Sequence, residues 1–269
     1  MFEQCQYFPH FALFKIIRAP QLLHFGVLIF FVSEPPVTSL FVMNLKYKCL
    51  ILDHDDTAVD STASIHYPAH QEIMRRIRPG SIPISLEGWF KKNFHPGIME
   101  YLVEELKFTE DELEQELAIW RDFTHNRTPR FYPGFIEMLQ EYKSRGGIVT
   151  VVSHSEVEII EAHYQQTDRN GTLFPELIFG WTFDAEKRKP NSYPVRQILQ
   201  KFDLKEDEVL IVDDLKPGVE MAKASGVPIA AAGWGHQIPE VRAYMEANCL
   251  AYLSEIDEMR ELVLLSSDF

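Results

Sequence analysis

Short apolar runs alternate with amphipathic segments along the chain from residue 48 onward. Polar residues flank each run, as is typical of buried parallel strands, and the runs are Cys49–Leu52, Ile148–Val152, Leu177–Phe179, Val209–Val212 and Ile229–Ala231. Helical periodicity marks the segments between them, which include Pro133–Arg145, Tyr193–Phe202 and Val219–Ser225. This alternation predicts an α/β fold with a doubly wound parallel sheet, whose ligands bind beyond the carboxyl ends of the strands.

One long interval between the first strand and the helix at Pro133 breaks this alternation. Its helical patterns are Ser61–Ile77, Ser85–Phe94 and Phe108–Trp120, the last with Thr109 as a predicted N-cap. A connection of that length inside a compact domain is normally a functional insertion. We therefore expect an α/β core made of residues 44–60 and 132–269, with residues 61–131 forming a helical cap over the active site.

The N-terminal segment differs in composition from the remainder. Residues 1–42 hold eight of the 19 Phe but only two of the 40 acidic residues. The apolar stretch Gln21–Val32 is shorter than the roughly 20 residues that span a bilayer, and no small-residue cleavage site follows it. We expect residues 1–43 to be an extension outside the fold, with Met43 as an alternative start, and no membrane partner unless this segment supplies one.

Charge and cysteine usage restrict the classes of partner and the compartment. The formal net charge of −14 argues against nucleic acid and anionic membrane surfaces as partners. It leaves room for an anionic substrate, because a metal and a few basic side chains can reverse the sign inside a cleft. The three cysteines are scattered and show no C-x-x-C spacing, which favours reduced thiols in a cytoplasmic protein.

Three carboxylates stand within four positions directly after the first predicted strand, in the stretch ILDHDDTAVDST. Asp53, Asp55 and Thr57 form D-x-D-x-T, and residues two apart in a strand face the same side. Crowded like charges cost stability unless a cation or a proton lies between them, so the spacing indicates a metal site, an acid–base pair, or both. The alternative is a turn with acidic caps, in which Asp56–Thr62 begins a helix.

Polar side chains also follow the other predicted strands. Ser153 offers a hydroxyl for a phosphate oxygen, and Lys189 offers an ammonium that could bind phosphate and keep a carboxylate ionised. Asp213 and Asp214 supply the hard oxygen ligands that suit Mg²⁺. Each residue alone is commonly a helix cap or a solvated charge. Together, at successive strand ends, they predict a site for a phosphorylated ligand.

The chain resembles the haloacid dehalogenase-like (HAD) superfamily, and within it the phosphoglycolate-phosphatase-like members with a helical cap on a Rossmann-like core. The resemblance rests on DxDxT…VDS from Asp53, on VVSHS, on Lys189-Pro190, on YPG at Tyr132 and on VDDLKPGVEMAKASGV from Val212. Two positions depart from the family pattern: Asp56 stands where Gly is frequent, and Gly218 stands where a second acidic residue is frequent.

The resemblance implies a role for each motif residue. Asp53 would be the nucleophile and a Mg²⁺ ligand, and Asp55 would be the general acid–base with its backbone carbonyl on the metal. Thr57 would orient the catalytic loop beside the phosphate. Ser153 and Lys189 would hold the phosphoryl group. Asp213 and Asp214 would complete the metal site, and the spacing to Ala222–Gly226 favours Asp214 as the direct ligand.

The implied function is a cytoplasmic, Mg²⁺-dependent phosphatase that hydrolyses a small phosphorylated metabolite through an aspartyl-phosphate. A phosphomutase would use the same residues, a dehalogenase would need neither Asp55 nor a metal, and a phospho-receiver or silent binding module would lack turnover. The motifs name neither the substrate nor the oligomeric state. Basic cap residues are the candidates for specificity: Arg75, Arg76, Lys91, Lys92, His95 and Arg121.

Overall fold

The computed structural model describes residues 45–168 and 170–264. The predicted extension at residues 1–43 therefore lies outside the described residues, as do Asn44 and the last five residues of the predicted core. Among the described helices, none combines the length and apolar character needed to cross a bilayer.

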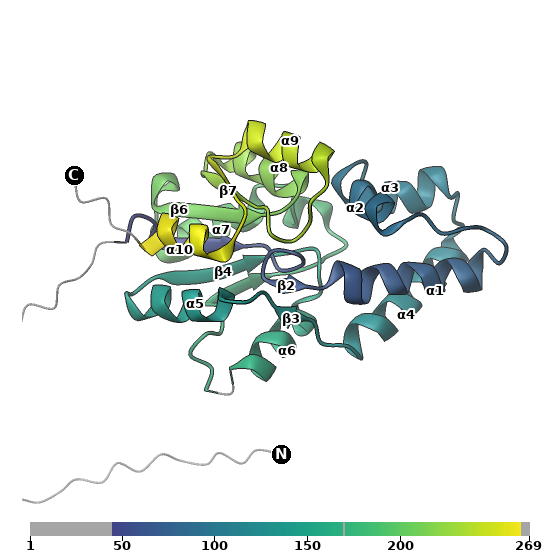
Figure 1. Ribbon diagram of the computed structural model, residues 1–269, viewed down its shortest axis with the longest axis horizontal. Coiled ribbons are helices and arrows are strands. Elements are labelled where there is room, and N and C mark those ends of the chain that lie inside the picture. The colour runs from purple at the N-terminus through teal and green to yellow at the C-terminus, as the bar shows by residue number, and fades with distance from the viewer. Residues whose placement is uncertain (1–44, 169, 265–269) are drawn as a thin grey trace, which may run out of the picture. The chain divides into compact units, whose positions relative to one another are not determined.

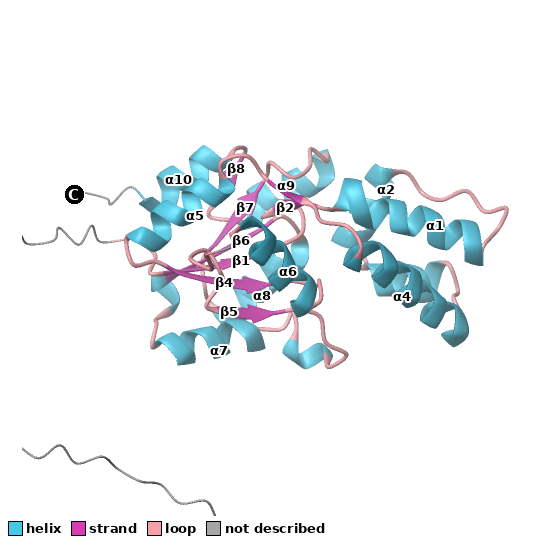
Figure 2. Ribbon diagram, turned by 90° about the horizontal axis from the view of Figure 1, so that it is seen from below, coloured by secondary structure: helices cyan, strands magenta, loops and turns pink. Residues whose placement is uncertain are grey.

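A six-stranded parallel sheet forms the centre of the structure, with strand order β5-β4-β1-β6-β7-β8 (Figure 2). Its strands are β1 (Cys49–Leu52), β4 (Ile148–Val152), β5 (Leu177–Phe179), β6 (Val209–Asp213), β7 (Ile229–Ala232) and β8 (Ala251–Leu253). Leu50 of β1 pairs with Val149 on one side and with Leu210 on the other. The central β1 is fully buried, and the five predicted strands are all present.

Helices cover both faces of this sheet, because alternate residues of each strand face opposite sides. Leu50 and Leu52 pack in an apolar cluster with α5 (Phe135–Ser144), α6 (Val157–Thr167) and α10 (Ile256–Leu264). Cys49 and Ile51 pack in a second cluster with helices of the other face, which are α7 (Tyr193–Phe202), α8 (Lys216–Ser225) and α9 (Pro239–Asn248) (Figure 1). The predicted doubly wound α/β architecture is confirmed.

A helical insertion separates β2 (Val59–Asp60) from β3 (Arg130–Phe131), which pair antiparallel at its base. Its α-helices are α1 (Tyr67–Ile77), α2 (Leu86–Phe94), α3 (Ile98–Glu100) and α4 (Glu110–His125), and its π-helical turns are η1 (Thr62–His66) and η2 (Tyr101–Glu105). Thr109 caps α4 as predicted, since its hydroxyl accepts from the Glu112 amide and the Glu112 carboxylate accepts from the Thr109 amide. The insertion has an apolar cluster of its own around Trp89.

The interpretation of Asp56–Thr62 as the start of a helix is wrong. Asp56 has a positive φ of 57°, and its amide donates to the Val59 carbonyl, so the chain makes a tight turn into β2 before η1 begins at Thr62. Gly is favoured at such a left-handed position, and Asp is one of the few other residues that tolerate it. This explains how Asp56 can replace the frequent Gly of the family pattern.

Candidate active site

The candidate catalytic side chains lie at the carboxyl edge of the sheet because the strand pairing continues one residue beyond β1 and β4. The Asp53 amide donates to the Val212 carbonyl, and the Ser153 amide donates to the Phe179 carbonyl, each at 2.9 Å. Asp213 is the last residue of β6. The parallel strands therefore deliver these side chains to one edge of the sheet.

Lys189 is buried between two of these carboxylates. Its Nζ donates to Asp53 Oδ1 at 2.6 Å and to Asp213 Oδ2 at 2.9 Å, and only 5% of the lysine is exposed. Burial by itself lowers the pKa of Lys189, but the charges of Asp213 and Asp53 raise that pKa well above its ordinary value. The lysine is therefore a permanent cation beside the first carboxylate of D-x-D-x-T.

Three buried carboxylates form a compact acidic group. Asp53, Asp213 and Asp214 each offer one oxygen, and these oxygens lie within 4.8 Å of one another. Burial raises the pKa of Asp53, Lys189 lowers it, and the two neighbouring carboxylates raise it again, with a net shift well above the ordinary value. Burial and the charge of Asp213 likewise raise the pKa of Asp214. One cationic lysine thus leaves this group with excess negative charge.

The acidic group fits a divalent cation. Asp214 Oδ2 is buried and has no hydrogen-bond partner among the described residues, although His236 Nε2 lies 3.3 Å away. Both oxygens of Asp213, by contrast, accept hydrogen bonds, Oδ2 from Lys189 and Oδ1 from the Leu215 amide. Buried carboxylate oxygens in excess over protein donors are the hard ligands that Mg²⁺ and similar ions take. Asp53 and Asp214 are therefore the most available ligands.

Gly218 allows the Asp213 carboxylate to reach this position. A Cβ atom added at Gly218 would lie 2.2 Å from Asp213 Cγ, which no packed structure accommodates without displacement. The acidic residue that is frequent here in the family pattern would need the same space. The Asp213 carboxylate therefore occupies the space that an acidic side chain at position 218 would need.

Gly218→Ala is expected to lower the free energy of unfolding by about 1–3 kcal/mol, the usual cost of overpacking a close-packed interior. Thermal or denaturant unfolding measures this loss. Gly88→Ala in α2 is the matched control, because its added Cβ would meet only the side chains of Ile84, at 3.2 Å, and Ser85, at 3.4 Å. Equal stability of the two variants would contradict the close approach at Asp213.

Asp55 lies in a different environment from Asp53 and gives no side-chain oxygen to the acidic group. Ser155 Oγ donates to Asp55 Oδ2 at 2.6 Å, Ser61 Oγ donates to Oδ1 at 2.7 Å, and His66 Nε2 lies 3.0 Å from Oδ1. Burial alone raises the pKa of Asp55, but the charge and hydrogen bond of His66 and the bond from Ser155 lower it well below its ordinary value. This environment stabilises the ionised carboxylate.

His66 is oriented by Trp120 of α4. Trp120 Nε1 donates to His66 Nδ1 at 3.2 Å, and the two rings stack. In the neutral form of His66 this bond selects the tautomer with its proton on Nε2, so Nε2 donates to Asp55 in the neutral ring as it does in the charged one. His66, Trp120, Ser61 and Ser155 were not among the predicted site residues. Ser61 and Ser155 had a usable signal, because they are the last residues of the VDS and VVSHS motifs.

The remaining motif residues lie around the same site. Ser153 Oγ is 3.4 Å from Asp55 Oδ2, and Thr57 Oγ1 is buried without a hydrogen-bond partner among the described residues. The Thr57 carbonyl accepts from Trp234 Nε1 at 2.9 Å, which ties the D-x-D-x-T loop to the segment after β7. The structure thus brings together Asp53, Asp55, Thr57, Ser153, Lys189, Asp213 and Asp214.

The basic cap residues proposed for specificity are largely engaged elsewhere. Arg75 and Arg76 pair with Glu72, and Arg121 pairs across to Glu156 of the core. Lys91 and Lys92 pair with Glu87 and Glu105. Five of the six candidates therefore have carboxylate partners, and His95 is exposed.

Comparisons with known proteins point to one family. A profile of the family described as haloacid dehalogenase-like hydrolase matches residues 50–232. Among curated proteins, pyrophosphatase PpaX of Bacillus anthracis (strain A0248) is 27% identical over 168 residues, which cover 60% of this chain and 73% of that protein. PpaX of Bacillus cereus (strain ATCC 10987 / NRS 248) is 28% identical over 173 residues, with the same coverage.

Solved structures show the same fold. CbbY from Rhodobacter sphaeroides in complex with phosphate superposes with a TM-score of 0.62 at 17% identity, over 79% of this chain and 96% of that chain. A haloacid dehalogenase-like family hydrolase from Streptococcus pneumoniae superposes with a TM-score of 0.63 at 17% identity, over 80% and 97%.

Proposed function

Because the chain belongs to the haloacid dehalogenase-like hydrolase family, we propose that it is a Mg²⁺-dependent phosphatase that hydrolyses a small phosphorylated metabolite through an aspartyl-phosphate. The predicted family and the predicted enzyme class, a phosphatase-type hydrolase, are confirmed by the family match and by relatives named as phosphatases. The observation that carries the finer proposal is the buried Asp53–Lys189 pair within the acidic group.

Asp53 is the proposed nucleophile. Its carboxylate attacks the phosphorus atom, the bond from phosphorus to the ester oxygen breaks, and the leaving oxygen takes a proton. Lys189 supports this role because its fixed positive charge favours the ionised carboxylate and attracts the phosphoryl oxygens. Ser153 and Thr57 are the proposed hydroxyl donors to the same oxygens, and the unpartnered Thr57 Oγ1 is consistent with this role.

Asp55 is the proposed general acid–base. In its protonated form it gives a proton to the leaving oxygen, and the ionised form then takes a proton from the water that attacks the aspartyl-phosphate. That second step releases phosphate and restores the Asp53 carboxylate. Hydrogen bonds from Ser155, Ser61 and His66 favour the ionised form, so the base role in hydrolysis is well supported.

Asp53 and Asp214, with the Asp55 backbone carbonyl, are the proposed holders of Mg²⁺, and Asp213 adjoins them while holding Lys189. When bound, the ion supplies charge that offsets the carboxylates and the phosphoryl oxygens. The donor set supports a hard divalent cation, because one oxygen of Asp214 is buried without a protein donor.

Residues 61–131 are the proposed cap on a core of residues 44–60 and 132–269. Two groups of the insertion support this role: Ser61 and His66 both contact Asp55, and Trp120 orients His66. We also propose a cytoplasmic location, consistent with the free Cys49 and Cys249.

Phosphate release from phenyl phosphate, measured with Mg²⁺ and with a chelator, tests the proposed function. We expect turnover that requires the metal. Turnover without any divalent ion would contradict the metal dependence. Failure to turn over this substrate and a panel of phosphorylated metabolites would favour the receiver or binding-module alternative.

Asp55→Asn is expected to slow hydrolysis of the aspartyl-phosphate more than its formation when the leaving group is an aryl oxygen, which needs little protonation. Phospho-enzyme then accumulates in rapid-quench measurements, by a factor of about ten or more over wild type. Ser64→Ala is a control, because Ser64 bonds only backbone carbonyls nearby. Equal slowing of both steps, for good and poor leaving groups alike, would show that Asp55 has no acid–base role.

A further inference from the structure

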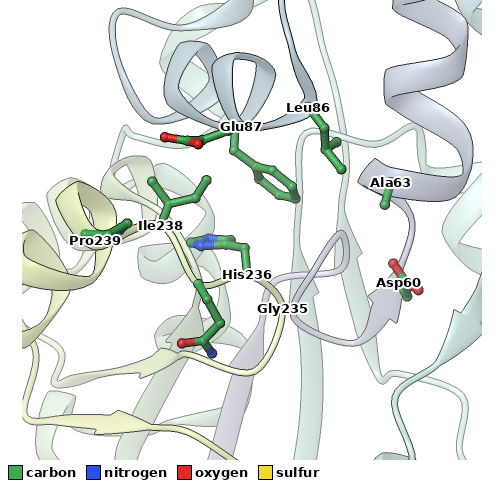
Figure 3. A pocket seen from close by; sticks show the side chains of 10 residues that line it. Asp60, Ala63, Leu86, Glu87, Gly235, His236, Ile238 and Pro239 are labelled. Carbon is green, nitrogen blue, oxygen red and sulfur yellow. The ribbon is translucent and has the colours of Figure 1, made fainter.

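A pocket of about 380 Å³ lies between the helical insertion and the segment that follows β7 (Figure 3). The insertion contributes Ala63, Leu86, Glu87 and Phe90, with Asp60 at its base. The opposite wall is the segment from Gly235 to Pro239. Its volume falls within the range of pockets that bind small molecules.

The pocket adjoins the acidic group through His236. This side chain lines the pocket, and its Nε2 lies 3.3 Å from Asp214 Oδ2. Gly235 packs against the main chain of the D-x-D-x-T loop, because a Cβ added there would lie 2.1 Å from the Asp56 carbonyl oxygen. Ser61, which donates to Asp55, stands between the pocket residues Asp60 and Ala63. These contacts place the pocket directly beside the reacting groups.

The walls favour a flat group with an apolar face. The Phe90 and His236 rings pack against each other, with centroids 5.0 Å apart and planes tilted by 49°, and Leu86 and Ile238 add aliphatic surface beside them. The His236 side chain is only 7% exposed. Its Nε2 faces Asp214 Oδ2 at 3.3 Å, and its Nδ1 has no hydrogen-bond partner among the described residues. A buried ring nitrogen without a partner is costly unless a ligand supplies one.

The charge of the walls disfavours a second anion. No Lys or Arg of the described chain lines the pocket. Lys91 Nζ lies 2.8 Å from the Glu87 carboxylate and offsets its charge. The Asp60 carboxylate, by contrast, makes no hydrogen bond or ion pair within the described residues, where only its backbone carbonyl accepts, from Ser64. The pocket therefore carries one carboxylate without a hydrogen-bonded ion-pair partner in the described part of the chain, with Arg130 opposite Asp60 in the β2–β3 pairing.

We infer that this pocket holds the leaving group of the substrate, and that it selects phosphomonoesters whose leaving group is a flat, uncharged or cationic ring-bearing group over those with a second phosphate or carboxylate. The inference rests on the proposed phosphatase function and names its substrate class. Contact with the apolar surface of Leu86, Phe90 and Ile238 places the ring, and the Asp60 carboxylate attracts a cation or a hydrogen-bond donor at its edge.

Three phosphate esters of the same shape test the charge preference: phenyl phosphate, its para-aminomethyl derivative, which is cationic at neutral pH, and its para-carboxylate. The measured quantity is the ratio of kcat/KM for the cationic over the anionic ester, which a partial loss of active enzyme does not alter. We expect a ratio of about ten or more in wild type, the effect of one charge a few ångströms away at a partly solvated site. Asp60→Lys should bring the ratio below one, and Asp60→Asn should bring it close to one.

Asp207→Lys is the matched control, with the same change in net charge at an exposed position in η4 (Glu206–Glu208), which precedes β6 at the amino edge of the sheet, opposite the edge that carries the site. It should leave the ratio at its wild-type value. A ratio that Asp60→Lys does not change, or a wild type that prefers the para-carboxylate, would overturn the inference alone. Absence of hydrolysis of all three esters by wild type would overturn the proposed function and this inference with it.

Discussion

Asp53→Asn is expected to lower kcat/KM more than about 1,000-fold, which corresponds to about 4 kcal/mol of transition-state stabilisation. The amide cannot form an acyl-phosphate, so the covalent route is lost. The fold should persist, because Asn keeps the size of the side chain and its backbone amide still donates to the Val212 carbonyl. Steady-state hydrolysis of phenyl phosphate measures the loss, and far-UV circular dichroism checks the fold.

Asp56→Asn is the matched control for this substitution. Asp56 is buried three positions further on, and its Oδ1 accepts from the Thr62 amide, a bond that an Asn oxygen can also accept. Burial and the charge of Asp214 raise the pKa of Asp56 to about 8, so its side chain is largely uncharged at neutral pH already. Asp56→Asn should retain most of the activity. An Asp53→Asn variant with more than about a tenth of the wild-type rate would contradict the covalent mechanism.

Much of the fold could be predicted because the strands that are buried on both faces of the sheet are short apolar runs in the sequence. β1, β4 and β5 match the predicted segments, and β6 and β7 are each one residue longer. β8 was missed although it ends the apolar run Cys249–Leu253; two of its three residues are half-buried at the sheet edge. The predicted helical segments do not include α6, α9 and α10 either.

The candidate site likewise contains residues that could be predicted from the sequence and residues that could not. Asp53, Ser153, Lys189, Asp213 and Asp214 could be predicted because strand ends in a parallel sheet share one edge. The partners of Asp55 could not, because His66 and Trp120 come from two segments of the insertion, 54 positions apart, and meet only through tertiary packing. The pocket at His236 likewise joins α2 to the segment after β7, a contact that no local pattern encodes.

Lys189→Met is expected to lower the free energy of unfolding by about 3–5 kcal/mol at neutral pH, the usual result of removing one partner from a buried ion pair. The substitution leaves Asp53, Asp213 and Asp214 buried with no protein cation, while the methionine fills most of the lysine's volume. Activity should fall at least about 100-fold, because the nucleophile loses the charge that keeps it ionised. Denaturant unfolding and phenyl phosphate hydrolysis measure the two effects.

The stability deficit of Lys189→Met should shrink as the pH falls from about 7 to about 5. Burial and neighbouring carboxylates raise the folded-state pKa of Asp53 and Asp214 above their unfolded values, so these groups favour the folded state at low pH and lose that contribution as the pH rises through the folded pKa. Without Lys189, repulsion raises those pKa values further, and protonation relieves it. Mg²⁺ should raise the Tm of the variant more than that of wild type, since the ion replaces the missing charge.

Lys187→Met is the control. Lys187 is exposed and pairs only with Asp184 among the described residues, so its loss should change neither the stability nor its pH dependence appreciably. A Lys189→Met deficit that is the same at both pH values and insensitive to Mg²⁺ would show that lost packing, and not the uncompensated carboxylates, destabilises the variant.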